Sequence, residues 1–229
     1  MEQKKRLYSG ENFTINDDTI YIEDSPTNQL TDIIIEEMKT VRRVEFDRNF
    51  TGDVDGLIPD NIEEIIFGKY FNGPVNNLPK NLKSLIFLRT FDQRIDNLPV
   101  GLEELILSEE FNQPIDNLPI NLKILKISDE FNQPIDFLPD NLEKLVLGWS
   151  FEQSLDNLPK NLKKLILRCQ YKGSLNNLPN SIETLRIPLY HKKIKKLPTS
   201  LKKIIISDNY EYNLPNGIYE VKIIEEDPE

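Results

Sequence analysis

Two residues of this sequence are of the types that most often act as nucleophiles or metal ligands, the thiol of Cys169 and the imidazole of His191. A nucleophilic cysteine needs a neighbouring base, and a zinc site needs several nitrogen or sulfur ligands. The sequence holds no second cysteine or histidine, and it lacks the G-x-x-x-x-G-K-[ST] and G-x-G-x-x-G motifs that bind nucleotide phosphates. We therefore predict a protein that is not an enzyme, with no catalytic residue, metal site or cofactor.

The surroundings of Trp149 indicate binding rather than catalysis. This tryptophan occupies a position that equivalent segments fill with Glu109, Asp129 or Cys169. Both Trp and Arg are enriched at interaction hot spots. Packing of the indole on a neighbouring loop is the alternative interpretation. The predicted partner-binding patch consists of Lys126, Lys144, Val146, Trp149, Lys164, Ile166, Arg168 and Arg186.

A tandem repeat must position these residues. The pair Leu-Pro recurs every 20 residues from Leu78-Pro79 to Leu178-Pro179, and an aromatic residue precedes most of these prolines by eight positions. After each proline comes a Leu-x-x-Leu-x-Leu block, as at residues 162–167. The last two leucines of the block are two residues apart, which is typical of a short strand with one buried side. The Leu-Pro-x-Asn sequence before the block predicts a turn.

A single coil of this repeat cannot bury its own apolar edge, so neighbouring coils must stack. We predict a leucine-rich-repeat-like repeat solenoid with one parallel β-sheet of about ten short strands, irregular convex loops and an N-terminal helix/strand cap. Stacking places equivalent residues in columns. The asparagines at 77, 97, 117, 157 and 177 should form one such column, in which they satisfy backbone groups of the next coil.

Two further columns should lie on the exposed strand face. The first alternates in sign through Glu63, Lys83, Glu103, Lys123, Glu143, Lys163, Glu183 and Lys202. Neighbouring strands lie about 4.8 Å apart, so each charge should lie between two opposite ones and fix the register of the stack. The second column contains Ile66, Ile86, Ile106, Lys126, Val146, Ile166, Arg186, Ile205 and Lys222. It indicates either an apolar contact strip or only the strand preference of β-branched residues.

The sequence divides into three parts. Residues 1–40 lack the repeat and should form the cap, with a strand at 19–22 and a helix that begins at Ser25-Pro26. The apolar face of this helix should comprise Leu30, Ile33, Ile34 and Met38. Residues 41–224 should form the solenoid, with its first strand at 41–46 and its last at 218–223. Residues 225–229 are an acidic tail.

The phrase Phe-Asn-Gln-Pro-Ile-Asp at residues 111–116, repeated at 131–136, resembles the FNIP repeat. This leucine-rich-repeat variant is abundant in social amoebae and in giant viruses of amoebae, and the resemblance covers about residues 50–200. The resemblance implies a protein-interaction module with a host-targeting or ubiquitin-ligase-adaptor-like role, and a viral protein. Some family members carry an upstream F-box, a pattern that residues 1–40 do not clearly show.

The distribution of charge leaves three kinds of partner open. Residues 157–203 hold twelve Lys or Arg and one Glu, a formal charge of +11, which leaves −21 on the remainder. The first candidate is a protein with an acidic surface and an apolar centre, bound on the strand face. The second is nucleic acid or another polyanion bound through residues 157–203, against which the negative remainder argues. The third is weak head-to-tail self-association of the basic zone with the acidic N-terminal half.

The composition also predicts where the protein resides. No apolar run approaches the roughly 20 residues of a membrane helix, and no apolar stretch follows the basic start of the sequence. A single cysteine fits a reducing compartment. We therefore expect no membrane association and a cytoplasmic protein, in the host-cell cytoplasm if the protein is viral.

Overall fold

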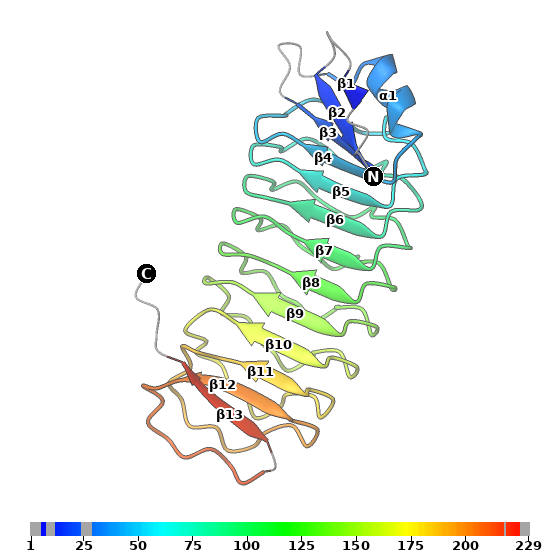
Figure 1. The fold of residues 1–229 in the computed structure, drawn as a ribbon. Helices are drawn as coiled ribbons and strands as arrows, with labels where there is room; N and C mark the ends of the chain where they lie inside the picture. Colours follow the sequence, from blue (N-terminus) through cyan, green and yellow to red (C-terminus); the bar gives the residue numbers. More distant parts are fainter. Residues whose placement is uncertain (1–5, 8–11, 24–28, 218, 225–229) are drawn as a thin grey trace.

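The computed structural model describes residues 6–7, 12–23, 29–217 and 219–224, and it shows a long solenoid built on a single sheet (Figure 1). Among these residues, thirteen strands lie in the sheet in the order of the sequence. They are β1 (Arg6–Leu7), β2 (Phe13–Asn16), β3 (Thr19–Ile22), β4 (Arg43–Phe46), β5 (Glu64–Phe67), β6 (Ser84–Phe87), β7 (Glu104–Ile106), β8 (Ile124–Lys126), β9 (Lys144–Leu147), β10 (Lys164–Leu167), β11 (Thr184–Arg186), β12 (Lys203–Ser207) and β13 (Glu220–Ile224). The pairs β1–β2 and β2–β3 are antiparallel, and pairing from β3 to β13 is parallel. The predicted solenoid with one parallel sheet is therefore confirmed.

The length of the repeat sets the register of the sheet. Leu125 pairs with Leu105 on one side and with Leu145 on the other, so equivalent residues of successive coils are neighbours. All three leucines are fully buried, because side chains along a strand alternate between the core and the exposed face. Each coil thereby covers the apolar edge of the coil before it, which is why the coils are stable only as a stack.

The aromatic residues of successive coils form a stack through the core. The ring centroids of Phe91, Phe111, Phe131 and Phe151 follow one another at 6.2, 6.2 and 6.3 Å. The ring of Tyr171 continues the stack at 6.3 Å. The spacing is regular because the sheet holds the coils at a fixed separation. These buried rings fill the core between the sheet and the loops behind it.

Two sets of asparagines bind the preceding coil, and the set that the sequence pattern singled out does so through side chains of that coil and not through its backbone. The side-chain amide of Asn141 donates to the backbone carbonyl of Ile120 at 3.0 Å. The same type of contact recurs at Asn81, Asn121 and Asn161. In the predicted column, by contrast, Asn157 donates to the carboxylate of Asp136 at 2.9 Å, and Asn77, Asn117 and Asn177 likewise contact aspartates. The predicted backbone role of this column was wrong, because a carboxylate of the preceding coil is within reach and is the stronger acceptor.

A hairpin and one helix close the N-terminal end of the solenoid. Strands β2 and β3 turn through Asp17, whose φ of 51° lies in the left-handed region that aspartate tolerates in tight turns. The helix α1 spans Asp32–Met38, and the hydroxyl of Thr31 caps it by accepting a hydrogen bond from the Ile34 amide. The predicted helix start at residues 25–26 lies outside the described residues, and the observed helix begins later because Thr31 supplies the N-cap.

Both ends differ in detail from the prediction. Of the predicted helix face, Ile34 and Met38 are buried and Ile33 is exposed, because the short helix turns only one narrow stripe to the core. Strand β13 begins at Glu220, while Ile218 and the acidic residues 225–229 lie outside the described part of the chain. The hairpin partner β2 was not predicted. No helix among the described residues is long and apolar enough to cross a bilayer.

Candidate interaction surface

The exposed face of the sheet carries a column of β-branched side chains. Ile86, Ile106 and Ile166 are half-buried, because equivalent side chains of the adjacent strands stand directly beside them. Val146 is more deeply covered, with only 5% of its surface exposed. This member of the predicted patch therefore supports its neighbours and offers little area of its own to a partner.

A hollow of about 470 Å³ lies on this face near the C-terminal end of the sheet. Five members of the predicted patch line it, namely Trp149, Lys164, Ile166, Arg168 and Arg186. Strand register explains part of this arrangement, because Ile166, Arg186 and Ile205 occupy successive rungs of β10, β11 and β12. The rungs provide an apolar floor interrupted by one guanidinium group.

The cations around this hollow are not neutralised within the protein. Among the described residues, Lys164, Arg168 and Arg186 take part in no ion pair. Charged side chains on a folded surface keep their hydration when unpaired, so these groups remain available to a carboxylate or phosphate. The hollow therefore combines apolar surface with uncompensated positive charge.

Two further cations of the predicted patch lie on the adjacent strands, outside the hollow. Lys144 pairs in register with Lys164 on β10, and Lys126 is on β8. Burial lowers the pKa of the Lys144 ammonium group, and the charges of Lys126 and Lys164 lower it further. Lys126 has a partial counterion in Glu104, with 3.5 Å between the ammonium nitrogen and the carboxylate. An anionic ligand placed beside Lys144 would relieve this repulsion.

Trp149 follows β9 at a point where the backbone runs against the preceding coil. A Cβ atom built on Gly148 would lie 2.1 Å from the carbonyl oxygen of Ser128, so the glycine permits this close approach. The indole of Trp149 is 49% exposed. Packing on a neighbouring loop, the alternative interpretation of this residue, therefore leaves about half of its surface available.

The sequence analysis missed half of the residues that line the hollow. They are Thr184, Pro188, Leu189, Ile205 and Ile224. The register of the repeat places Thr184 and Ile205 next to predicted members, so the columns alone could have found these two. Pro188 and Leu189 follow β11 in a coil whose Leu-Pro spacing shortens to 19 residues, so the 20-residue period did not predict their position.

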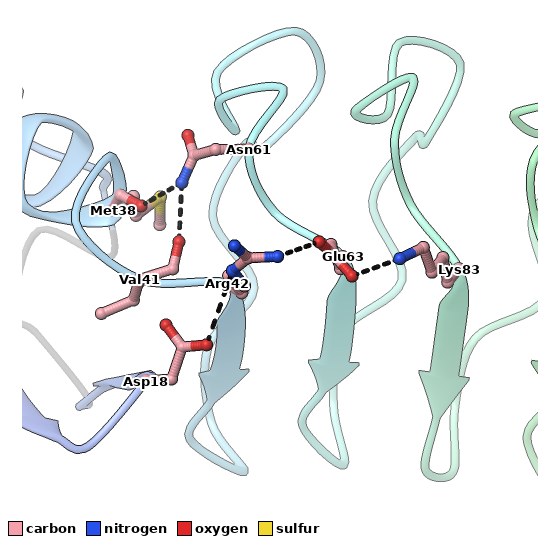
Figure 2. A network of polar contacts seen from close by, with 7 residues as sticks. All are labelled: Asp18, Met38, Val41, Arg42, Asn61, Glu63 and Lys83. Atoms are coloured by element: carbon pink, nitrogen blue, oxygen red, sulfur yellow. Dashed lines mark hydrogen bonds and ion pairs between the residues drawn. The ribbon is translucent and has the colours of Figure 1, made fainter.

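A second hollow, of about 670 Å³, lies at the N-terminal end of the molecule and is lined by charges that pair with one another. Figure 2 shows Arg42 between Asp18 and Glu63, at 3.9 and 2.6 Å, and Lys83 at 2.5 Å from the other oxygen of Glu63. Asn61 donates to two backbone carbonyls of the cap. Because its charges are compensated, this hollow is the weaker candidate for binding a charged partner.

The alternating charge column forms discrete pairs. Lys123 contacts Glu103 of the preceding coil at 2.7 Å. The same arrangement pairs Lys163 with Glu143 and Lys202 with Glu183. The hydrogen bond that the Lys123 ammonium group donates to Glu103 raises the pKa of Lys123, and the more distant charge of Glu143 adds to it. Opposite charges on both sides therefore act on Lys123, and the contact with Glu103 is the stronger of the two.

Cys169 and His191 lie apart from this surface. The Cys169 side chain is buried, and burial raises the pKa of its thiol to about 11, so the thiolate that would act as a nucleophile is disfavoured. His191 is exposed at the rim of a shallow hollow near Asp208 and Tyr210. Within the part of the chain that the structure describes, no group of three or more His, Cys, Asp or Glu could hold a metal ion.

Comparison with known protein families identifies the repeat. The model of the FNIP repeat matches five overlapping segments, residues 54–88, 73–110, 91–129, 111–150 and 131–170, which together extend over just more than half of the chain. The chain belongs to the FNIP-repeat family. The matched segments include β9, Trp149 and β10, so the N-terminal half of the hollow is built from FNIP repeats, and β11 to β13 continue the same stack beyond them.

The fold of this FNIP-repeat chain is similar to a solved structure titled as that of CroV588, a novel circular LRR protein. The TM-score is 0.68 at 26% sequence identity, and the alignment covers 93% of this chain and 41% of the other. This chain thus spans less than half of the length of its structural relative. The search of curated proteins gives no match. The FNIP-repeat chain is a scaffold of the leucine-rich-repeat type, whose extended surface suits protein binding.

Proposed function

We propose that this FNIP-repeat chain is a protein-binding scaffold that holds an acidic segment with an apolar centre on its strand face, over β9 to β13. The apolar centre of the segment packs on Trp149 and Ile166, and its carboxylates pair with Arg168 and Arg186, which also line the hollow. Lys144 on the adjacent strand extends the cationic surface.

The observation that carries this proposal is the combination of a half-exposed indole with cations that no acid of the described residues neutralises. Tryptophan and arginine together are the residues most enriched at binding hot spots. The hollow, at about 470 Å³, lies in the size range of pockets that take a small ligand or a few side chains. The contrast with the N-terminal hollow, whose charges are paired, supports the choice of site.

Nucleic acid is a second candidate, because the same cations would attract phosphates. The excess of negative charge outside residues 157–203 opposes a long polyanion, whereas a short acidic segment of a protein needs only the local cluster. Binding of RNA or DNA would weaken steeply with salt, since each neutralised phosphate releases counterions.

A displayed peptide library selected against the intact chain tests the proposal. We expect the enriched peptides to carry Asp or Glu on both sides of an aromatic or aliphatic residue. Their affinity should fall at least about tenfold in the triple variant Trp149→Ala, Lys144→Glu, Arg168→Glu, because a few hot-spot residues carry most of the binding energy.

The matched control is the triple variant Tyr70→Ala, Lys69→Glu, Arg89→Glu, which makes the same kinds of change at the N-terminal end of the sheet. It should leave the affinity of the selected peptides unchanged, and both variants should melt with the cooperativity of the wild type. Peptides that bind both triple variants as tightly as the wild type would contradict the proposed site. Enrichment of peptides without acidic residues would contradict the proposed partner.

A further inference from the structure

The last strand, β13, exposes side chains at positions that are buried in every other strand of the parallel sheet. Val221 is the register partner of Ile204, and Ile223 is the partner of Ile206. The two isoleucines of β12 are 0% and 6% exposed, whereas Val221 is 45% and Ile223 is 62% exposed. Among the described residues, no strand beyond β13 covers these two side chains.

The backbone edge of β13 is open as well. Within the described residues, β13 pairs with β12 and with no strand on its other side. An exposed edge strand is a template for pairing with another chain, and proteins usually protect it with prolines or inward-pointing charges. The inward positions of β13 carry Val221 and Ile223, and no proline interrupts the strand. The exposed Tyr212 adds apolar area near this end of the stack.

At the opposite end of the sheet, within the part of the chain that the structure describes, the outermost strand β1 has only two residues. There the core is covered by the β2–β3 hairpin and by α1, and Phe13, Ile20 and Met38 are buried. Figure 1 shows this covered end and β13 at opposite extremes of the stack. Head-to-tail stacking of two copies would place the open end of one against the closed end of the other. Two copies that contact each other through the same end must be related by a twofold axis.

We propose that β13 is a self-association edge, on which a second copy of the chain pairs its own β13 in antiparallel orientation about a twofold axis at Val221. The pairing satisfies the free backbone groups of both edges and continues the sheet from one copy into the other. It also buries Val221 and Ile223, whose exposure is the feature to be explained.

The charges of the strand select this register. With the axis at Val221, Glu220, which also contacts Lys203 of β12 at 2.7 Å, faces Lys222 of the partner subunit on the exposed side of the sheet, and opposite charges in such pairs are stabilising. An axis at Lys222 would instead place two lysines opposite each other, which is destabilising. On the core side, Ile223 faces Tyr219 of the partner subunit, so apolar surface meets apolar surface.

The expected dimer is weak. A stable interface buries roughly 1,200–2,000 Å² in total, and a pairing of two five-residue strands with adjacent tyrosines lies at or below the lower end of that range. We therefore expect a dissociation constant in the micromolar range.

Sedimentation velocity of the full chain, over protein concentrations from about 1 to about 200 µM, tests the proposal across the affinity expected of so small an interface. The wild type should shift from monomer to dimer, and Ile223→Lys should remain monomeric because it places a charge in the paired edge. Ile33→Lys, a matched substitution of an exposed isoleucine in the helix of the opposite end, should dimerise like the wild type. A wild type that stays monomeric, or an Ile223→Lys variant that associates equally, overturns the proposal.

A cysteine at the twofold axis tests the register and remains informative if Ile223→Lys fails to fold. Directly opposite residues of antiparallel strands have Cα atoms about 4.5–5.5 Å apart, which a disulfide can span. In a Cys169→Ala background, Val221→Cys should form a covalent dimer on mild oxidation, and Ile33→Cys should not. Equal crosslinking of the two overturns the proposed axis. The Trp149 triple variant should dimerise normally, so this proposal and the peptide-binding proposal fail independently.

Discussion

In four coils the asparagine two residues after the proline, at positions 81, 121, 141 and 161, binds a backbone carbonyl of the preceding coil. Asn141 does so through the carbonyl of Ile120. We expect Asn141→Ala to lower the free energy of unfolding by about 0.5–1 kcal/mol, the net value of one partly solvated hydrogen bond. Lys160→Ala, at the exposed position after the proline of the next coil, is the control and should change it less. Urea unfolding of both variants measures the difference, and equal effects would remove the asparagine from this role.

The charge column also acts at the scale of single residues. Lys123 lies between Glu103, which it contacts, and Glu143, so Lys123→Glu would align three carboxylates on neighbouring strands. We expect this variant to melt at a lower temperature than Lys160→Glu, because Lys160 forms no ion pair within the described residues. The gap between the two melting temperatures should shrink as salt is added, since these charges are exposed. A gap that is absent at low salt would show that the column does not fix the register.

The sequence predicted contacts along the columns better than contacts between them. Residues 20 apart had to be neighbours, so Lys144 beside Lys164 followed from the period. Asn157 donates its hydrogen bond to Asp136 and not to a backbone carbonyl. This choice of acceptor depends on the geometry of the loop, which the repeat period does not specify. Ile224, at the end of β13, also lines the hollow, and the repeat did not predict this position.

At the scale of the coil, the stack of aromatic rings stabilises the core by packing each coil against its neighbours. The ring of Phe131 lies between Phe111 and Phe151 and is almost fully buried. We expect Phe131→Ala to cost about 3–5 kcal/mol of stability, the usual range for removing a buried phenylalanine. Phe137→Ala, in the same coil but largely exposed, is the matched control and should cost much less. Thermal unfolding compares them, and a similar loss in both would mean that the stack is not the main source of cohesion.

The strands of the repeat and the cap strand at Thr19–Ile22 were predictable, and the start of the cap helix was not, for a physical reason. The last two leucines of the Leu-x-x-Leu-x-Leu block are two residues apart, which indicates a strand. Because the block repeats, its apolar side chains can be buried only if successive coils stack. The cap occurs once, so its helix start depended on choosing between two possible N-cap residues, Ser25 and Thr31. Both residue types are good N-caps, and the structure places the cap at Thr31.

Positive charge is concentrated toward the C-terminal end of the molecule, and this uneven distribution restricts where an acidic partner can bind. The basic segment 157–203 lies at the C-terminal part of the sheet, and the unpaired cations of the hollow belong to it or border it. The N-terminal hollow is lined by paired charges, and the hairpin β2–β3 and helix α1 cover the core at that end. A binding site on the strand face should therefore be confined to the strands from β9 onward.

The most direct test of that claim measures which isoleucines along the strand face respond when a peptide binds. With isoleucine methyl groups labelled for NMR, a peptide of the predicted class should shift the signals of Ile166 and Ile205, which line the hollow. The signals of Ile66, Ile86 and Ile106, on the same face but toward the N-terminus, should stay in place. Shifts confined to these three N-terminal isoleucines, or no shift in any of the five under saturating peptide, would contradict the account.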